Sequence, residues 1–438
     1  MSTTQKRGMT SAIVATIAAG LITLSACSTN PADTTSPDPG NTDSPDLAAG
    51  VDDGTELTLW SRAATEQVTR AFVDAYNATH QNQVNLTIIP TDDFVTTVGG
   101  AAGSNTLPDL LSADIVFVPN WTSQGLFADI TDRIEALPFG GQVADAHVQA
   151  GVWDGKKHVV PHTMDLSVIF WNKDLYAQAG LDPDQGPRTL EELAEHARAV
   201  NAVPGDHAGT YFGGNCGGCL VFTWFPSIWA AGAEVMNEAG TEANFTSPQA
   251  KAVLDIYRGL VQDGIVLDGT REETGATWVA PFIDGKVGVM PMPNTMLPAA
   301  LEADFETGVI GIPGPGGGDS TFVGGDGLGI SKDSKNVDAA WHFLAWTLTE
   351  EAQLDVLAAN GFAVARTDLV DNEFAAADAR LVTINEVAGK GKTPFAQNFN
   401  AAFNAPSSPW IELFRNYVFG DGSTLESDNA AVTAELAR

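Results

Sequence analysis

The sequence predicts an α/β protein with parallel strands and a hinge inside the chain, and two stretches carry that prediction. Residues 56–60 alternate apolar and polar side chains as a strand does, residues 65–77 repeat apolar side chains at helical spacing, and residues 84–89 form a second strand. This order predicts a parallel pair joined by a right-handed crossover. Residues 159–175 join a polar segment to the apolar run 166–171, which predicts a buried strand and a domain hinge.

Length and charge limit the class of protein. The chain has 438 residues, 44% of them hydrophobic, which is enough for two or three domains with cores of their own. Its formal net charge of -33, from 55 acidic and 22 basic side chains, opposes binding to nucleic acid or anionic lipid. A neutral, cationic or calcium-associated ligand is favoured over an anionic one. The solubility of an exported protein is an equally simple reason for the excess acid.

The first residues look like an export signal. Lys6 and Arg7 precede an apolar run over residues 12–24 that is too short to cross a bilayer as a helix. Leu24-Ser-Ala-Cys27 resembles a bacterial lipobox, in which cleavage leaves the cysteine as a lipidated N-terminus. Ordinary cleavage after Ala26 is the alternative. The resemblance implies anchoring by lipid on the outer face of the membrane.

Residues 28–55 predict a tether, because they hold four prolines, six aspartates and no aromatic residue. Such a segment cannot bury enough apolar surface to offset its ordering entropy. After the first strand, helix and strand, residues 107–111 and 115–118 continue the sheet. Asn120 and Trp121 stand just beyond a strand end, which is where ligands bind in open α/β sheets. A helix is expected to begin after Thr189 as its N-cap.

Residues 159–175, Val-Val-Pro-His-Thr-Met-Asp-Leu-Ser-Val-Ile-Phe-Trp-Asn-Lys-Asp-Leu, resemble the crossover strand of extracellular solute-binding proteins of the sugar-binding family. Trp171 stands where that family usually has Tyr. Many relatives also have an aromatic residue near Asn294, and this chain does not. Later motifs that resemble the family are the helix in 213–232, the step at Gly285-Lys286, the glycine-rich return crossover at 312–330, the third crossing at 375–397 and the helix that opens at 407–410.

The resemblance implies a two-lobed, periplasmic-binding-protein-like fold of type II, with parallel-sheet lobes joined by a hinge of several crossings. The lobes are expected to meet at residues 163–166. The expected divisions are a signal peptide at 1–26, lipidated Cys27 with a disordered linker at 27–55, first-lobe segments at 56–164 and 325–394, and second-lobe segments at 165–324 and 395–438.

The sequence lacks the common motifs of catalytic and metal sites. There is no His-Glu-x-x-His, no Gly-x-Ser-x-Gly and no second Cys-x-x-Cys, and the seven histidines are scattered. The glycine-rich loop at 313–318 lacks a following Lys-Ser or Lys-Thr, and its prolines remove amide donors that a phosphate needs. We therefore expect no catalytic residue, no metal and no cofactor.

Cys216-Gly-Gly-Cys219 is the one motif that suggests enzymology. A redox-active pair opens a helix, whereas this pair is expected in a glycine-rich loop before the helix. With Cys27 lipidated, the two cysteines can pair only with each other inside the chain, and exported proteins meet oxidising conditions. A structural disulfide is therefore expected, with redox chemistry and a free pair as the alternatives.

Ligand contacts are expected from residues at strand ends, crossovers and helix starts. A flat aromatic face packs on the C–H face of a sugar ring, and carboxylates and amides bind its hydroxyl groups. The resemblance places one cleft aromatic at Trp224, and Trp341 and Trp346 are expected in the core. The expected ligand-binding residues are Trp60, Arg62, Asn120, Trp121, Asp165, Trp224, Trp278, Asn294, Asp326, Phe395, Gln397 and Trp410.

Taken together, the resemblance implies a lipid-anchored protein on the extracellular face of the membrane. Its expected partners are a neutral oligosaccharide, the permease subunits of an ABC importer, and the membrane through lipid on Cys27; nucleic acid is not among them, and a monomer is expected. The lobes would close on the sugar and the permease would recognise the closed form. A glycan-degrading enzyme and a surface receptor or adhesin without transport are the alternatives.

Overall fold

A computed structural model describes residues 50–438, so the predicted signal peptide, Cys27 and most of the predicted tether lie outside the described residues. Within this range the main sheet has the strand order β2-β1-β3-β10-β6-β8-β9, and β7 also pairs with β6. The strands are β1 (Glu56–Arg62), β2 (Gln83–Ile89), β3 (Leu110–Asp114), β6 (Val160–Asn172), β7 (Val289–Pro293), β8 (Thr307–Pro313), β9 (Asp319–Ser320) and β10 (Val323–Ile330).

The main sheet is mixed. β1 pairs in parallel with β2 and with β3, whereas every other neighbouring pair in the described sheet is antiparallel. The parallel arrangement predicted for both lobes is therefore limited to β2-β1-β3. Antiparallel pairing follows from the crossings, because β10 brings the chain back beside β6 in the opposite direction.

Helices and a small hairpin surround the sheet. The first predicted unit is confirmed, since α1 follows β1, buries the apolar stripe that includes Phe72 and Tyr76, and leads into β2. The helices are α1 (Glu66–Thr79), α2 (Thr91–Ser104), α3 (Val118–Ser123), α4 (Thr131–Ala136), α5 (Asp145–Ala150), α6 (Lys173–Gln178), α7 (Leu190–Asn201), α8 (Gly217–Ala230), α9 (Pro248–Gln262), α10 (Ala280–Ile283), α11 (Leu297–Leu301), α12 (Val337–Trp346), α13 (Glu373–Ala376), α14 (Ala379–Ala388), α15 (Pro409–Phe414) and α16 (Leu425–Leu436); the hairpin joins β4 (Val152–Trp153) to β5 (Lys156–Lys157).

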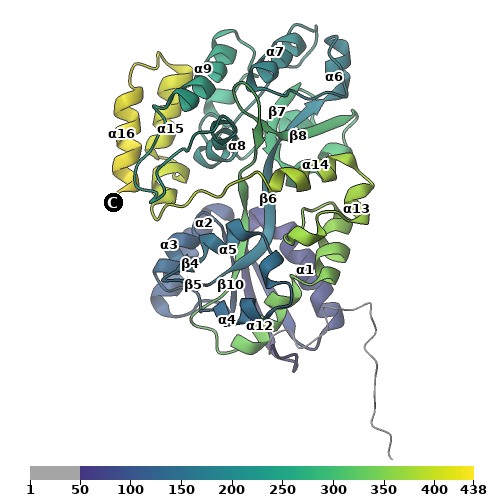
Figure 1. The fold of residues 1–438 in the computed structure, drawn as a ribbon, viewed down its shortest axis with the longest axis vertical. Coiled ribbons are helices and arrows are strands. Elements are labelled where there is room, and N and C mark those ends of the chain that lie inside the picture. Colours follow the sequence, from purple (N-terminus) through teal and green to yellow (C-terminus); the bar gives the residue numbers. More distant parts are fainter. Residues whose placement is uncertain (1–49) are drawn as a thin grey trace, which may run out of the picture. The chain divides into compact units, whose positions relative to one another are not determined.

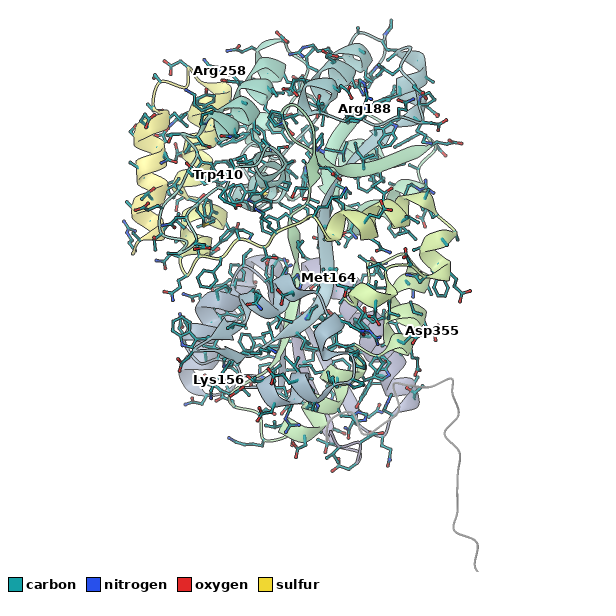
Figure 2. The ribbon with its side chains drawn as sticks, viewed as in Figure 1. Lys156, Met164, Arg188, Arg258, Asp355 and Trp410 are labelled. Carbon is teal, nitrogen blue, oxygen red and sulfur yellow. A yellow bond between two sulfur atoms is a disulfide. The ribbon has the colours of Figure 1, made fainter. Side chains whose placement is uncertain are left out.

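β6 confirms the buried strand expected from residues 159–175. Its first part pairs with β10, with Leu166 opposite Val323, and its second part pairs with β7 and β8, starting at Ser167. One strand therefore passes from the first lobe, built on β1–β3 and β10, to the second lobe, built on β7 and β8. Figure 1 shows β6 and β10 running together through the centre, and Figure 2 places Met164 of β6 there.

A third segment lies beside these two strands. The backbone of Lys392 forms a parallel β-bridge with that of Phe322, and the Thr393 hydroxyl donates to the carbonyl of Val323. α14, which precedes this segment, packs on β8, and Arg380 Nη1 donates to the Thr307 carbonyl at 3.2 Å. The predicted third crossing is thus in contact with the other two, and the exact lobe boundaries stay predictions.

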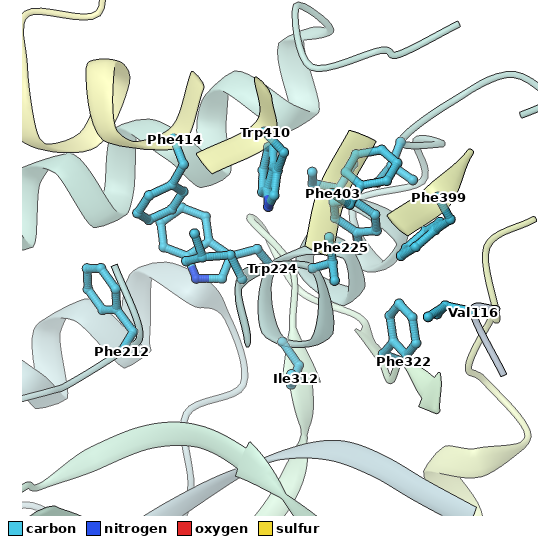
Figure 3. Close-up of a cluster of buried hydrophobic side chains, with 14 of the residues drawn as sticks. Val116, Phe212, Trp224, Phe225, Ile312, Phe322, Phe399, Phe403, Trp410 and Phe414 are labelled. Atoms are coloured by element: carbon cyan, nitrogen blue, oxygen red, sulfur yellow. The ribbon is translucent and has the colours of Figure 1, made fainter. Parts of the chain in front are cut away.

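Each lobe has a core rich in aromatic side chains. In the first lobe, α1 and α12 pack together, and Trp341 and Trp346 of α12 are buried as predicted. In the second lobe, aromatic residues of α8, α9 and α15 form one cluster, part of which Figure 3 shows around Trp224. These cores position the strand ends and helix starts from which a site is built.

The folded body begins earlier than predicted. Asn82 is fully buried, and its Oδ1 accepts hydrogen bonds from the backbone N–H groups of Asp53, Gly54 and Thr55 at 3.0–3.1 Å. Its Nδ2 donates to the Val51 carbonyl at 2.6 Å. A disordered linker through Thr55 was predicted, whereas Val51 and residues 53–55 hydrogen-bond to one buried amide side chain. Composition could not reveal this partner, because it lies almost thirty residues away along the chain.

Candidate ligand-binding site

A buried group of charges lies where the strands of the first lobe meet the crossing strands. Arg62, at the end of β1, forms ion pairs with Asp114 at the end of β3 (Nη1–Oδ2, 3.0 Å) and with Asp326 of β10 (Nη2–Oδ1, 2.6 Å). Its Nε also donates to Asp326 Oδ1 at 2.7 Å. The pairing follows from strand order, because β3 lies between β1 and β10 and Asp114 is opposite Asp326.

Asp326 is fully buried, and both of its carboxylate oxygens accept hydrogen bonds. Its Oδ2 accepts from the hydroxyls of Thr65 (2.7 Å) and Ser112 (2.9 Å), while Oδ1 faces Arg62. Burial alone would raise the pKa of this carboxyl, but Arg62 and the hydroxyl donors outweigh it and hold the pKa below its usual value. Burial and the charge of Asp326 raise the pKa of Asp114 by more than Arg62 lowers it, so the Asp114 pKa lies above its usual value.

Asp165 lies beside this group on β6, opposite Gly324 of β10. The Thr295 hydroxyl, which follows β7 in the second lobe, donates to Asp165 Oδ1 at 3.3 Å. Burial raises the pKa of Asp165 to about 7, with the Asp114 and Asp326 carboxylates adding to the shift and Arg62 and Thr295 opposing it. Among residues 50–438, no basic side chain forms an ion pair with the Asp165 carboxyl at the hinge, because Arg62 is paired with two other carboxylates.

Replacing Asp165 by Asn should change how stability depends on pH. The folded protein holds this proton more tightly than the unfolded chain, because the pKa rises from 3.8 to about 7 on folding. Ionisation in the folded state therefore costs stability, and this cost builds up as pH rises from about 4 to about 7. Asn has no such cost, so Asp165→Asn should gain stability relative to the wild type over that interval. Thermal unfolding at a series of pH values tests this, and a difference that does not change with pH contradicts it.

Trp224 does not occupy the position expected of a cleft aromatic. Its side chain is 0% exposed, stacks on Tyr257 with ring centroids 3.7 Å apart and meets Phe414 edge-on at 4.2 Å. Figure 3 shows it inside the second-lobe cluster. The expectation that it stacks on a ligand is corrected, because a side chain with no exposed surface packs the core.

α8 instead brings Phe222 to the hinge. Two positions along a helix are about 200° apart, so Phe222 and Trp224 point to opposite sides of α8. The Phe222 ring lies 5.6 Å from that of Phe322, and a Cβ added at Gly324 would come within 3.1 Å of Phe222. Gly324 is the residue opposite Asp165. Phe222 is thus a partly buried aromatic beside Gly324, the residue opposite Asp165, and it was not among the residues expected from the sequence.

The remaining expected residues are dispersed. Trp410 is fully buried and stacked on Phe245 in the second-lobe core. The prediction that it contacts the ligand is therefore also wrong, and its side chain packs the core. Asn294 is buried, and its Oδ1 accepts from the backbone N–H of Leu166 at 2.6 Å, so it fixes the crossing strand. Ligand roles stay predictions for half-buried Trp60 and Asn120, buried Trp121 and Trp278, and exposed Phe395 and Gln397.

Other features of the described residues do not define this site. A cavity of about 570 Å³ lies elsewhere, in the second lobe, between β8 and α14. Four of its charged lining residues are paired, since Lys173 contacts Asp184 at 2.7 Å and Arg380 contacts Asp378 at 2.7 Å. Within residues 50–438, no three His, Cys, Asp or Glu side chains are grouped so that they could hold a metal, and no helix is long and apolar enough to span a bilayer.

The fold and the hinge define a two-lobed binding protein of type II, and comparison with known families agrees. The model of the family described as bacterial extracellular solute-binding protein matches residues 71–383. The chain belongs to this family, whose members bind a substrate outside the cell. The described structure is that of an α/β protein with a mixed sheet, so the predicted fold class and family are confirmed.

Relatives and solved structures include several sugar-binding proteins. The diacetylchitobiose binding protein of Streptomyces coelicolor is 22% identical over 383 residues, which cover 84% of this chain and 87% of that protein. The galactooligosaccharide-binding protein of Bacillus subtilis is 20% identical over 314 residues, covering 68% and 70%. The cyclic alpha-maltosyl-1,6-maltose binding protein of Arthrobacter globiformis has a TM-score of 0.74 at 24% identity, covering 88% of this chain and all of that one.

Proposed function

We propose that this protein captures an oligosaccharide between its two lobes and delivers it to an ABC import permease, while lipid on Cys27 anchors it to the membrane. The observation that carries the proposal is the group at the crossing strands. There, Asp165 lies next to the buried pair of Arg62 and Asp326, and the aromatic ring of Phe222 lies beside Gly324, the residue opposite Asp165. A carboxylate accepts hydrogen bonds from sugar hydroxyls, and an aromatic face packs on the sugar ring.

The hinge itself supports a closing movement. β10 reads Val-Gly-Gly-Asp-Gly-Leu-Gly-Ile, and the pairing with β6 changes register between Asp326 and Gly327. Gly325 has φ of +98°, a conformation that side chains rarely adopt, and a Cβ there would come within 1.9 Å of the Thr163 carbonyl oxygen. A strand with few side chains at its crossing can absorb a change of angle between lobes. The lobe segments predicted from the sequence are 56–164 with 325–394, and 165–324 with 395–438. Because α14 packs on β8, we assign α14 to the second lobe instead.

The sugar-binding relatives support carbohydrate as the ligand class, and the family's role as binding proteins supports the absence of catalysis. Calorimetric titration against neutral oligosaccharides tests both. The panel should include diacetylchitobiose, a galactooligosaccharide and a maltose-type sugar, each recovered and analysed afterwards. We expect saturable binding of at least one sugar, returned chemically unchanged. Binding of none of a broad panel overturns the oligosaccharide proposal, and hydrolysed sugar favours a glycan-degrading enzyme.

The anchor gives a separate prediction. Cys27→Ser should release the protein into the medium or leave it unprocessed, because serine has no thiol to which diacylglycerol can be attached. Cell fractionation and metabolic labelling with a fatty acid measure this. Cys216→Ser is the matched control, since it also replaces a cysteine by serine but lies within the folded body. A labelled, detergent-extractable protein in the Cys27→Ser strain contradicts the anchor.

A further inference from the structure

Cys216 and Cys219 are joined by a disulfide at the start of α8. Cys216 is the N-cap of this 14-residue helix, and its Sγ accepts a hydrogen bond from the backbone N–H of Cys219 at 3.1 Å. From the sequence, the pair was expected in a loop before the helix, a position that does not suit a redox-active pair. In the structure the motif does open the helix, so this argument against redox chemistry does not hold.

The two sulfur atoms differ in their surroundings. Cys219 is buried among Tyr211, Trp278 and other residues of a hydrophobic cluster, whereas Cys216 is partly exposed at the edge of that cluster. A thiol from solution therefore has a route to Cys216 and not to Cys219. Such a difference fits a pair in which one sulfur is attacked and the other leaves.

The helix start also favours the reduced state of Cys216. Free N–H groups and the positive end of the helix dipole stabilise a thiolate at the N-cap, as the Cys219 N–H contact to Cys216 Sγ illustrates. The disulfide closes a loop with only two residues between the cysteines, so the chain entropy that it removes from the unfolded state is small. Folding therefore gives this bond little protection from reduction.

We propose that Cys216–Cys219 is a thiol–disulfide exchange site that reacts with thiols or dithiols outside the cell membrane. In the first step an external thiolate attacks Cys216 Sγ, the bond to Cys219 breaks, and Cys219 leaves as a thiolate that takes up a proton. A second external thiolate then attacks the external sulfur of the mixed disulfide and releases Cys216. Two external thiols are oxidised to one disulfide, and the protein pair gains two electrons and two protons.

The surrounding backbone links this reaction to the proposed ligand site. A Cβ added at Gly275 would lie 2.8 Å from Cys216 Sγ and 3.0 Å from Cys219 Sγ, so this segment already touches both sulfurs. The Glu273 carboxylate holds the segment through Gly275 N (2.7 Å) and Thr277 Oγ1 (2.5 Å). Two separate thiols need more room than a disulfide. Reduction should therefore shift this segment or the first turn of α8.

Phe222 follows Cys219 by three residues and so lies on the same side of α8. Movement of the first turn would be passed to Phe222 and to its contact with Phe322. Resting on the proposed function, we infer that the reduced protein binds its oligosaccharide with a different affinity from the oxidised protein.

The exchange itself is tested without any sugar. The purified protein is equilibrated in mixtures of reduced and oxidised glutathione, quenched with acid and alkylated, and its free thiols are counted by mass spectrometry while circular dichroism confirms that it stays folded. We expect reversible reduction in mixtures that leave ordinary structural disulfides intact. In the reduced protein, iodoacetamide at pH 7 should modify Cys216 about tenfold faster than Cys219. A pair that stays oxidised in a large excess of reduced glutathione overturns the proposal.

Single variants provide the matched control. Cys219→Ser should accumulate a mixed disulfide with glutathione at Cys216, whereas Cys216→Ser should form little at Cys219. Equal modification of both variants contradicts the assigned roles. Titration of sugar into the oxidised and reduced forms then tests the coupling, and equal affinity overturns it. If no sugar binds either form, the proposed function fails while the thiol counts still decide the exchange chemistry.

Discussion

Arg62→Met is expected to lower the free energy of unfolding by about 3–5 kcal/mol, because it leaves buried carboxylates without their cation. Arg62 forms ion pairs with both Asp114 and Asp326, and Asp326 has no exposed surface. Met preserves much of the side-chain volume, so the effect reports charge rather than a cavity. Urea unfolding followed by circular dichroism at neutral pH gives the measurement.

A second substitution separates the ion pair from general damage. Asp326→Asn removes one of the unpaired charges, so Arg62→Met combined with Asp326→Asn should recover part of the lost stability. The loss in the single variant should also shrink at acid pH, where the carboxylates become protonated. If the stability lost in the double variant equals the sum of the losses in the two single variants, the two charges do not interact.

The parts of this fold that depend on local pattern were predicted from the sequence. β6 was recognised because the apolar, β-branched run 166–171 follows a polar segment. α7 was recognised because Thr189 can cap a helix, and the backbone N–H of Glu192 donates to the Thr189 hydroxyl at 3.0 Å. Such signals lie within a few residues of one another. They need no knowledge of distant partners, and the structure confirms both.

The site was predicted only in part, because its contacts join distant segments. Arg62 and Asp326 were both expected at the site, but their pairing spans 264 positions in the sequence and no spacing rule reveals it. Asp114 was missed, although it ends an apolar strand in the same way as the residues that were chosen at strand ends. Thr295 was missed because the turn after β7 offered no aromatic residue to draw attention to it.

The errors on α8 have one cause, which is the exact start and rotation of a helix. Capping by Cys216 sets where the helix begins, and a shift of two residues reverses the side to which an aromatic ring points. The run Leu-Val-Phe-Thr-Trp-Phe is apolar on nearly every side, so its periodicity cannot choose between Phe222 and Trp224. Packing against Tyr257 and Phe414 makes that choice.

Phe222→Ala should therefore affect chiefly the affinity for sugar, and Trp224→Ala chiefly the stability of the protein. Trp224→Ala removes a fully buried ring and is expected to lower the free energy of unfolding by about 3–5 kcal/mol. Phe222→Ala removes a partly exposed ring beside Gly324, the residue opposite Asp165, so its cost in stability should be smaller, while sugar affinity should fall at least about tenfold, or roughly 1.4 kcal/mol.

Denaturant unfolding and calorimetric titration with the sugar found for the wild type measure the two effects separately. Trp224→Phe is the matched control for the core position, since it keeps an aromatic ring against Tyr257 and should retain both most of the stability and the affinity. A well-folded Phe222→Ala protein with wild-type affinity would remove Phe222 from the site. A Trp224→Phe protein that is as stable as the wild type but binds sugar tenfold more weakly would return Trp224 to it, because lost core packing cannot produce that result.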